Sequence, residues 1–106
     1  MNALEKKILA DFRRKIDAQF PGCQLILFGS RARGDADPDS DMDVLVILDR
    51  GVSAKDVEAV SECAWEACLG QGIVLAPVAV SRHEWEEGTL SSSLLAIAVA
   101  QDGVRV

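Results

Sequence analysis

The sequence contains no apolar run close to the ~20 residues that a membrane-spanning helix needs. Its first stretch, Met1 to Arg14, is charged and amphipathic, whereas a signal peptide has an apolar core. The cysteines Cys23, Cys63 and Cys68 are odd in number and form no Cys/His cluster with the spacing of a metal site. We therefore expect a cytoplasmic protein with reduced, buried thiols and no contact with a membrane.

Positive charge is scarce, because 11 Lys and Arg stand against 17 Asp and Glu, and the formal net charge is −6 at pH 7. Binding to a nucleic-acid backbone draws on many contacts between Lys or Arg and phosphate. The composition therefore excludes broad electrostatic attachment to nucleic acid, and a polyanionic substrate would be held by bound cations or a local basic patch. With 106 residues, 49% of them apolar, the chain is expected to form a single domain over residues 1–106 around one core.

Hydrophobic periodicity and the positions of Gly, Pro and Ser predict the secondary structure. The predicted elements are, in order, a helix over 2–20, strands over 24–28 and 42–48, a helix over 53–70, a strand over 73–80, a short helix over 82–87, a longer helix over about 90–101 and a last strand over 104–106. Pro77 indicates an edge position or a bulge for the third strand, because proline cannot donate to the ladder. This order predicts an α+β fold in which a small mixed β-sheet carries helices mainly on one face.

Phosphate-binding features follow the first strand, where Gly29 and Ser30 stand between an apolar run and a polar loop. A glycine at the end of a buried strand lets the backbone turn sharply and approach a ligand closely. The amides that follow, together with the Ser30 hydroxyl, can then point at phosphate oxygens. Arg31 and Arg33 add positive charge beside this turn.

Two aspartates, Asp41 and Asp43, begin the second strand with one residue between them. On a strand this spacing places both side chains on the same face. Two carboxylates side by side repel each other unless a cation lies between them. Mg²⁺ typically takes one or two protein carboxylates and completes its shell with waters and substrate phosphates, so the pair is a candidate magnesium site.

This acidic segment has two other interpretations. Clusters of acids are most often simply solvated, but Asp43 runs directly into the apolar strand 44–48, which places the pair at the mouth of a buried strand. A calcium-binding loop would use alternating acids such as Asp35 and Asp37. It lacks the required glycine, since Ser40 stands there, and Val46 replaces the bidentate glutamate.

The segment resembles the signature of the DNA polymerase β-like nucleotidyltransferase superfamily, and in particular of its minimal, stand-alone members. The residues that carry the resemblance are Phe28-Gly29-Ser30, the ten residues Arg31 to Ser40, and Asp41-Met42-Asp43 within an apolar strand. The Gly-Ser-Arg-Ala-Arg-Gly wording over 29–34 is also that of the minimal family.

This resemblance implies a Mg²⁺-dependent transfer of a nucleoside monophosphate from a nucleoside triphosphate to an acceptor hydroxyl. Asp41 and Asp43 would bind the metal and serve catalysis, and the nucleotide would be bound by Gly29, Ser30, Arg31 and Arg33. Minimal nucleotidyltransferases resemble one half of two-protein systems, often toxin and antitoxin, whose other half is an all-helical HEPN-type protein. A HEPN-type partner and an oligomer are both compatible with the sequence.

One feature of the resembling family is missing, namely a third carboxylate on a later strand beside the first two. The corresponding segment 73–80 contains no acid, and none occurs between Glu66 and Glu84. A positioned general base is typically worth ~10²–10⁴ in rate. Three alternatives therefore stay open: an enzyme that relies on Asp41, Asp43 and the substrate phosphates, an enzyme completed by a partner chain, and a binding module without chemistry.

Three further side chains and one apolar run are candidates for chemistry or contacts. His83, the single histidine, is expected at the surface among glutamates, and Trp65 and Trp85 are expected in the core or at an interface. The run 94–100 is apolar on nearly all sides, so its helix should be buried or pack against a partner.

Overall fold

A computed structural model describes residues 1–106. The elements in chain order are α1 (Ala3–Gln19), β1 (Gln24–Phe28), α2 (Ser30–Arg33), β2 (Met42–Leu48), α3 (Ala54–Cys68), β3 (Leu75–Ser81), α4 (Arg82–Glu86), the 3-10 helix η1 (Thr89–Ser92), α5 (Leu94–Asp102) and β4 (Val104–Arg105). No helix reaches the length and apolarity that crossing a membrane requires.

The four strands form one mixed sheet in the order β3-β2-β1-β4. β1 runs antiparallel to both β2 and β4, whereas β2 and β3 are parallel and are joined by the crossover helix α3. The predicted α+β class with a small mixed sheet is therefore confirmed. β2 is the innermost apolar strand, because its residues 44–48 are all buried.

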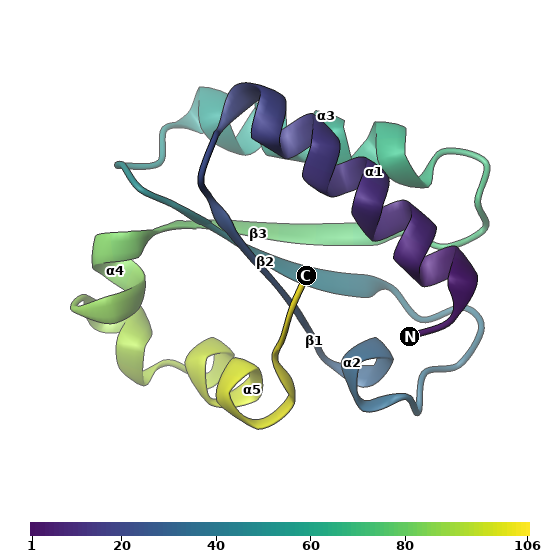
Figure 1. Cartoon of the computed structure of the whole chain (residues 1–106). Coiled ribbons are helices and arrows are strands. Elements are labelled where there is room, and N and C mark those ends of the chain that lie inside the picture. The colour runs from purple at the N-terminus through teal and green to yellow at the C-terminus, as the bar shows by residue number, and fades with distance from the viewer.

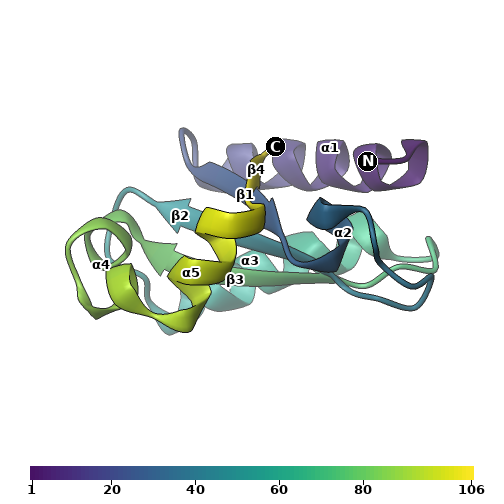
Figure 2. The ribbon, with the colours of Figure 1, turned by 90° about the horizontal axis from the view of Figure 1, so that it is seen from below.

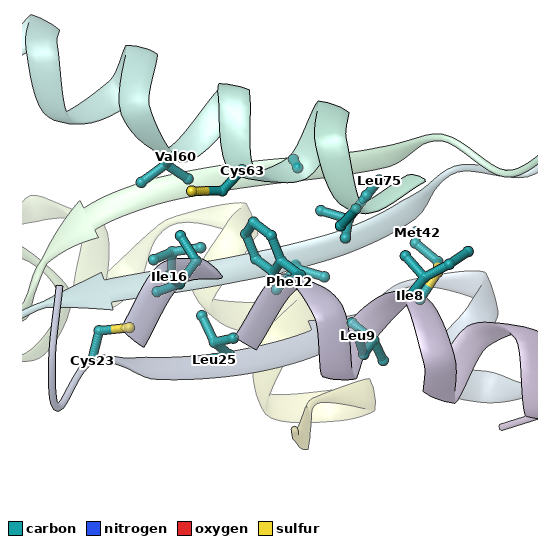
Figure 3. Packing of buried hydrophobic residues seen from close by; sticks show 14 of the residues in the cluster. Ile8, Leu9, Phe12, Ile16, Cys23, Leu25, Met42, Val60, Cys63 and Leu75 are labelled. Atoms are coloured by element: carbon teal, nitrogen blue, oxygen red, sulfur yellow. The ribbon is translucent and has the colours of Figure 1, made fainter. Parts of the chain in front are cut away.

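The two long helices, α1 and α3, lie side by side on one face of the sheet (Figure 1). Helix α1 faces the sheet through Ile8, Phe12 and Ile16, each with no exposed surface, and α3 contributes Val60 and Cys63 (Figure 3). Alternate residues of the strands point into the same layer, as the two-residue period of a strand requires. This layer is the main core, and it matches the prediction of helices mainly on one face.

The opposite face of the sheet carries the short elements α4, η1 and α5 (Figures 1 and 2). A smaller core lies under them, and its buried members are Ile26, Leu45, Ile47, Val80 and Val99. These elements leave part of this face uncovered near the start of β2, where Asp43 is only half-buried. The uncovered part is where the predicted site lies.

The predicted helix over about 90–101 is divided in the structure, which corrects the sequence-based expectation. Ser93 is extended, with φ −77° and ψ 166°, and its side chain accepts a hydrogen bond from the Ala96 amide at 3.2 Å, so α5 begins only after it. The Ser93 hydroxyl also donates to the Leu90 carbonyl at 2.7 Å, and Ser91 donates to Gly88 at 2.8 Å. Serine side chains compete for backbone groups in this way and favour caps over helix interiors.

Pro77 lies on β3, the strand at the outer end of the sheet, so the predicted edge position is confirmed. The Val74 carbonyl accepts a hydrogen bond from the Met42 amide at 2.8 Å, so the backbone groups of Val74, Ala76 and Val78 are the ones directed at β2. Backbone groups alternate in direction along a strand, so those of Pro77 face away from β2. The missing amide of Pro77 therefore removes a donor from the free edge and interrupts no ladder bond.

Candidate functional site

Gly29 ends β1 and starts the short helix α2 with φ 80° and ψ −160°. This conformation is essentially restricted to glycine. The turn is closed by bonds from the Ala32 and Arg33 amides to the Gly29 carbonyl, each 3.1 Å long. The chain thereby leaves the sheet abruptly, and Ser30 occupies the first position after the bend.

Sheet register brings the bend against the second aspartate, because Phe28 on β1 pairs with Asp43 on β2. A Cβ atom added at Gly29 would lie 2.7 Å from Oδ2 of Asp43. The backbone conformation therefore requires glycine at this position, and a side chain here would also push the Asp43 carboxylate aside. The structure joins the predicted phosphate-binding turn to one of the predicted metal ligands.

The two aspartates differ in their surroundings. Asp43 is half-buried on β2, whereas Asp41 immediately precedes the strand and is exposed. Burial raises the pKa of Asp43, and the neighbouring charge of Asp41 raises the pKa further. The charge of Asp41 therefore acts on the Asp43 carboxyl.

This donor set fits a magnesium ion that keeps part of its shell for water and phosphate. Two carboxylates are the usual protein contribution to such an ion, and a bound cation would relieve the repulsion that raises the pKa of Asp43. The structure contains no group of three or more His, Cys, Asp or Glu side chains that could hold a metal ion. Substrate oxygens would therefore have to complete the shell.

The position of the missing third carboxylate can be identified on β3. Ala76 pairs with Asp43 across the parallel β2–β3 ladder, and directly paired residues project to the same face of a sheet. Asp43 therefore lies between the half-buried Ala76 on β3 and Phe28 on β1. No acidic residue occupies this position of β3, as the sequence indicated.

Arg31 makes contacts that the sequence did not predict. Its side chain is 6% exposed and forms an ion pair with Glu5 of α1 at 3.2 Å. The same guanidinium donates to the Ser40 carbonyl at 2.9 Å, the Pro38 carbonyl at 3.1 Å and the Asp37 carbonyl at 3.4 Å. With these partners Arg31 holds the loop that leads to Asp41, and its Nε, Nη1 and Nη2 atoms all have partners within the chain.

Glu5 was not among the residues that the sequence singled out. Burial raises its pKa, but the Asn2 amide and Arg31 together outweigh that effect, so the pKa of Glu5 is lowered overall. Its side chain accepts from the Asn2 amide at 2.8 Å, and the Glu5 amide donates back to Asn2 at 2.8 Å. Asn2 followed three residues later by Glu5 is the spacing of a capping box, a signal that was present in the sequence.

Arg33 remains half exposed beside the bend. Its guanidinium donates to Asp35 at 3.2 Å and to Asp102, at the end of α5, at 3.0 Å. It therefore links the turn to the C-terminal helix while leaving part of its surface open to a ligand.

The remaining candidate residues are not part of the arrangement formed by Gly29, Asp41 and Asp43. His83 is exposed and contacts only Glu87 among the acids, at 3.0 Å between Nδ1 and Oε2. Trp85 packs against the smaller core, in line with its prediction, whereas the side chain of Trp65 is 64% exposed on α3. On the apolar helix α5, Val99 is buried but Leu94 is 85% exposed.

Comparison with known proteins places these features in a family. Residues 6–98 match the nucleotidyltransferase domain family. A curated relative from Methanocaldococcus jannaschii, named "Putative protein adenylyltransferase MJ0141", is 36% identical over 55 residues. That match covers 52% of this chain and spans 56% of the relative, little more than half of its length.

Two solved structures share the fold. A crystal structure described as a toxin-antitoxin with AMP-PNP has a TM-score of 0.60 at 21% identity, over 95% of this chain and 70% of that one. A crystal structure described as a putative nucleotidyltransferase from Sulfolobus solfataricus has a TM-score of 0.51 at 18% identity, over 99% of this chain and 86% of that one. Both likenesses concern the fold, and the family match includes the Gly29 bend and both aspartates. The chain belongs to the nucleotidyltransferase domain family.

Proposed function

We propose that this chain transfers a nucleoside monophosphate from a nucleoside triphosphate to an acceptor hydroxyl, with Mg²⁺ held by Asp41 and Asp43. The observation that carries the proposal is the closeness of Gly29 to Asp43. A Cβ atom added at Gly29 would lie 2.7 Å from Oδ2 of Asp43. A bend that can receive phosphates thus lies directly against a carboxylate that can receive a divalent cation.

In this proposal the residues divide the work according to their positions. Asp41 and Asp43 hold the cation, while the Ser30 hydroxyl and the amides at the bend orient the triphosphate. Arg33 adds a partly exposed positive charge at the edge of the bend. When bound, Mg²⁺ would stabilise negative charge on the phosphate oxygens during in-line displacement of pyrophosphate.

The acceptor that we propose is a hydroxyl of another protein, and the donor is ATP. Support comes from the relative named as a protein adenylyltransferase and from the structural neighbour described as a toxin-antitoxin with AMP-PNP. The resemblance to minimal nucleotidyltransferases extends this proposal to a helical, HEPN-type partner in a toxin-antitoxin system.

A second candidate function is a module that binds a partner protein without catalysis. It is favoured by Ala76, which stands where a third carboxylate would complete the metal site. Large apolar side chains at the surface also favour a partner, since Trp65 on α3 and Leu94 on α5 are both mostly exposed.

The two functions can be separated by incubating the protein with labelled nucleoside triphosphates, Mg²⁺ and a candidate partner. Label that appears on the partner and disappears with Asp41→Ala/Asp43→Ala supports transfer. A matched control is Asp37→Ala/Asp39→Ala, which removes the same charge from exposed loop residues. Nucleotide binding without any label transfer would instead support the binding module, and the absence of both binding and transfer would contradict the proposal.

A further inference from the structure

We propose that the buried Glu5–Arg31 pair is a positioning device that sets where Asp41 stands relative to Asp43, and thereby tunes metal binding. Arg31 acts through the loop backbone and does not touch the substrate. This inference rests on the proposed function, because it concerns the same metal site.

The loop between α2 and β2 has no regular secondary structure that would fix its position. Residues 34–41 contain no helix or strand, and Asp41 at its end is exposed. The position of the Asp41 carboxylate therefore depends on the peptide that carries it. The Ser40 carbonyl belongs to that peptide, and it accepts from Nε of Arg31 at 2.9 Å.

A second nitrogen of the guanidinium, Nη2, binds the preceding turn of the loop. That turn is closed by a 3.0 Å bond from the Ser40 amide to the Asp37 carbonyl. Nη2 of Arg31 donates to the carbonyls of Asp37 and Pro38, while Nη1 binds Glu5. One rigid, planar group thus connects three loop carbonyls with a carboxylate, an arrangement that the point charge of lysine cannot reproduce.

Glu5 supplies a fixed anchor on the other side. It lies in the first turn of α1, and its second oxygen is held by the Asn2 amide at 2.8 Å. The side chains of Glu5 and Arg31 are 7% and 6% exposed, so the pair is almost fully removed from water.

Burying an ion pair rarely adds net stability, because the cost of desolvation offsets the attraction. Here the buried pair fixes the position of the loop that carries Asp41, because it links this loop to α1, a helix of the main core. These contacts explain why an arginine directly follows Ser30, and they require no contact between this arginine and a phosphate.

The test compares two conservative variants, Arg31→Lys and Arg13→Lys. Arg13 is a matched control because it also donates to backbone carbonyls, those of Cys23 at 2.9 Å and Val106 at 2.6 Å, which belong to other segments of the chain. Both variants should lower Tm. Arg31→Lys should in addition weaken the binding of Mn²⁺, used as a spectroscopic probe for Mg²⁺, by about 10-fold or more, whereas Arg13→Lys should leave it unchanged.

Hydrogen exchange in the metal-free protein provides a second readout. The amides of residues 35–42 should exchange faster in Arg31→Lys than in the wild type, and at the wild-type rate in Arg13→Lys. Equal Mn²⁺ affinity in Arg31→Lys and the wild type would overturn the positioning role, as would equal weakening in both variants. A wild-type protein that binds no Mn²⁺, while the loop amides still respond to Arg31→Lys, would overturn the proposed metal site and show that the pair orders the loop alone.

Discussion

Gly29 lies next to Asp43 at the end of the β1–β2 ladder, so closely that a methyl group added to Gly29 would lie 2.7 Å from Oδ2 of Asp43. The bend at Gly29 and the carboxylate of Asp43 therefore form one structural unit, although 13 positions separate them in the chain. The proposed nucleotide and metal sites share this unit, and a change at either residue should affect both.

Gly29→Ala should destabilise the protein and abolish binding of Mn²⁺ and nucleotide. The backbone conformation alone costs of order 1–3 kcal/mol for a residue with a side chain, and the new methyl group would displace Asp43. Gly22→Ala is the control, because Gly22 also has φ +80° but nothing within 4 Å of its Cβ position. Urea unfolding and calorimetric titration would measure both effects, and normal ligand binding by Gly29→Ala would contradict the proposed site.

Asp43→Asn should raise Tm in the absence of metal. The pKa of Asp43 is raised by burial and by Asp41, so folding disfavours the ionised form of this carboxyl. For a chain of about this size a gain of 1 kcal/mol corresponds to about 4–8 °C. Asp39→Asn, at an exposed loop position, should leave Tm nearly unchanged.

Addition of Mg²⁺ should make the Tm of the wild type higher than that of Asp43→Asn. A ligand that binds only the folded state stabilises it, so Mg²⁺ should raise the Tm of the wild type but not that of Asp43→Asn. Thermal melts in EDTA and in excess Mg²⁺ check the prediction, and a lower metal-free Tm for Asp43→Asn than for the wild type would contradict it.

Metal affinity should fall with decreasing pH at values above the ordinary aspartate pKa of 3.8. Metal binding requires the deprotonated carboxylate, and the raised pKa of Asp43 brings protonation to higher pH. In the metal-free protein the same shift should make Asp43 favour folding increasingly as pH falls from its folded-state pKa towards 3.8.

An NMR titration of the Asp43 carboxyl carbon without metal would measure the shift directly. Asp41→Asn should move the midpoint down, because the charge of Asp41 is the second cause of the shift after burial. A midpoint at or below the ordinary value in the wild type would be inconsistent with the structure.

Ala76→Asp should create a third carboxylate beside Asp43, because the two residues pair across β2 and β3. Without metal the added charge should lower Tm through repulsion, and with Mg²⁺ both metal affinity and any nucleotidyl transfer should increase. Val78→Asp is the matched control, since Val78 lies on the same face of β3 but pairs with Leu45. Equal effects of the two variants on metal affinity would show that position 76 does not adjoin the site.

The local elements were accessible from the sequence because helix and strand periodicity are properties of short segments. The spacing of apolar residues predicted helices over 2–20 and 53–70, and α1 and α3 are present there in the structure. The divided helix at Ser93 was missed, since its apolar pattern outweighed the tendency of serine to cap.

For the site, the sequence by itself determined which residue types were available and which side chains could share a strand face. Gly29, Ser30, Asp41 and Asp43 follow from that local geometry, as does the absence of an acid on the third strand. Only the tertiary structure decided that Gly29 meets Asp43 and that Arg31 turns toward Glu5, 26 residues away. Pairing across a sheet and burial of a charge depend on packing between distant segments, and no short sequence pattern encodes which partner is chosen.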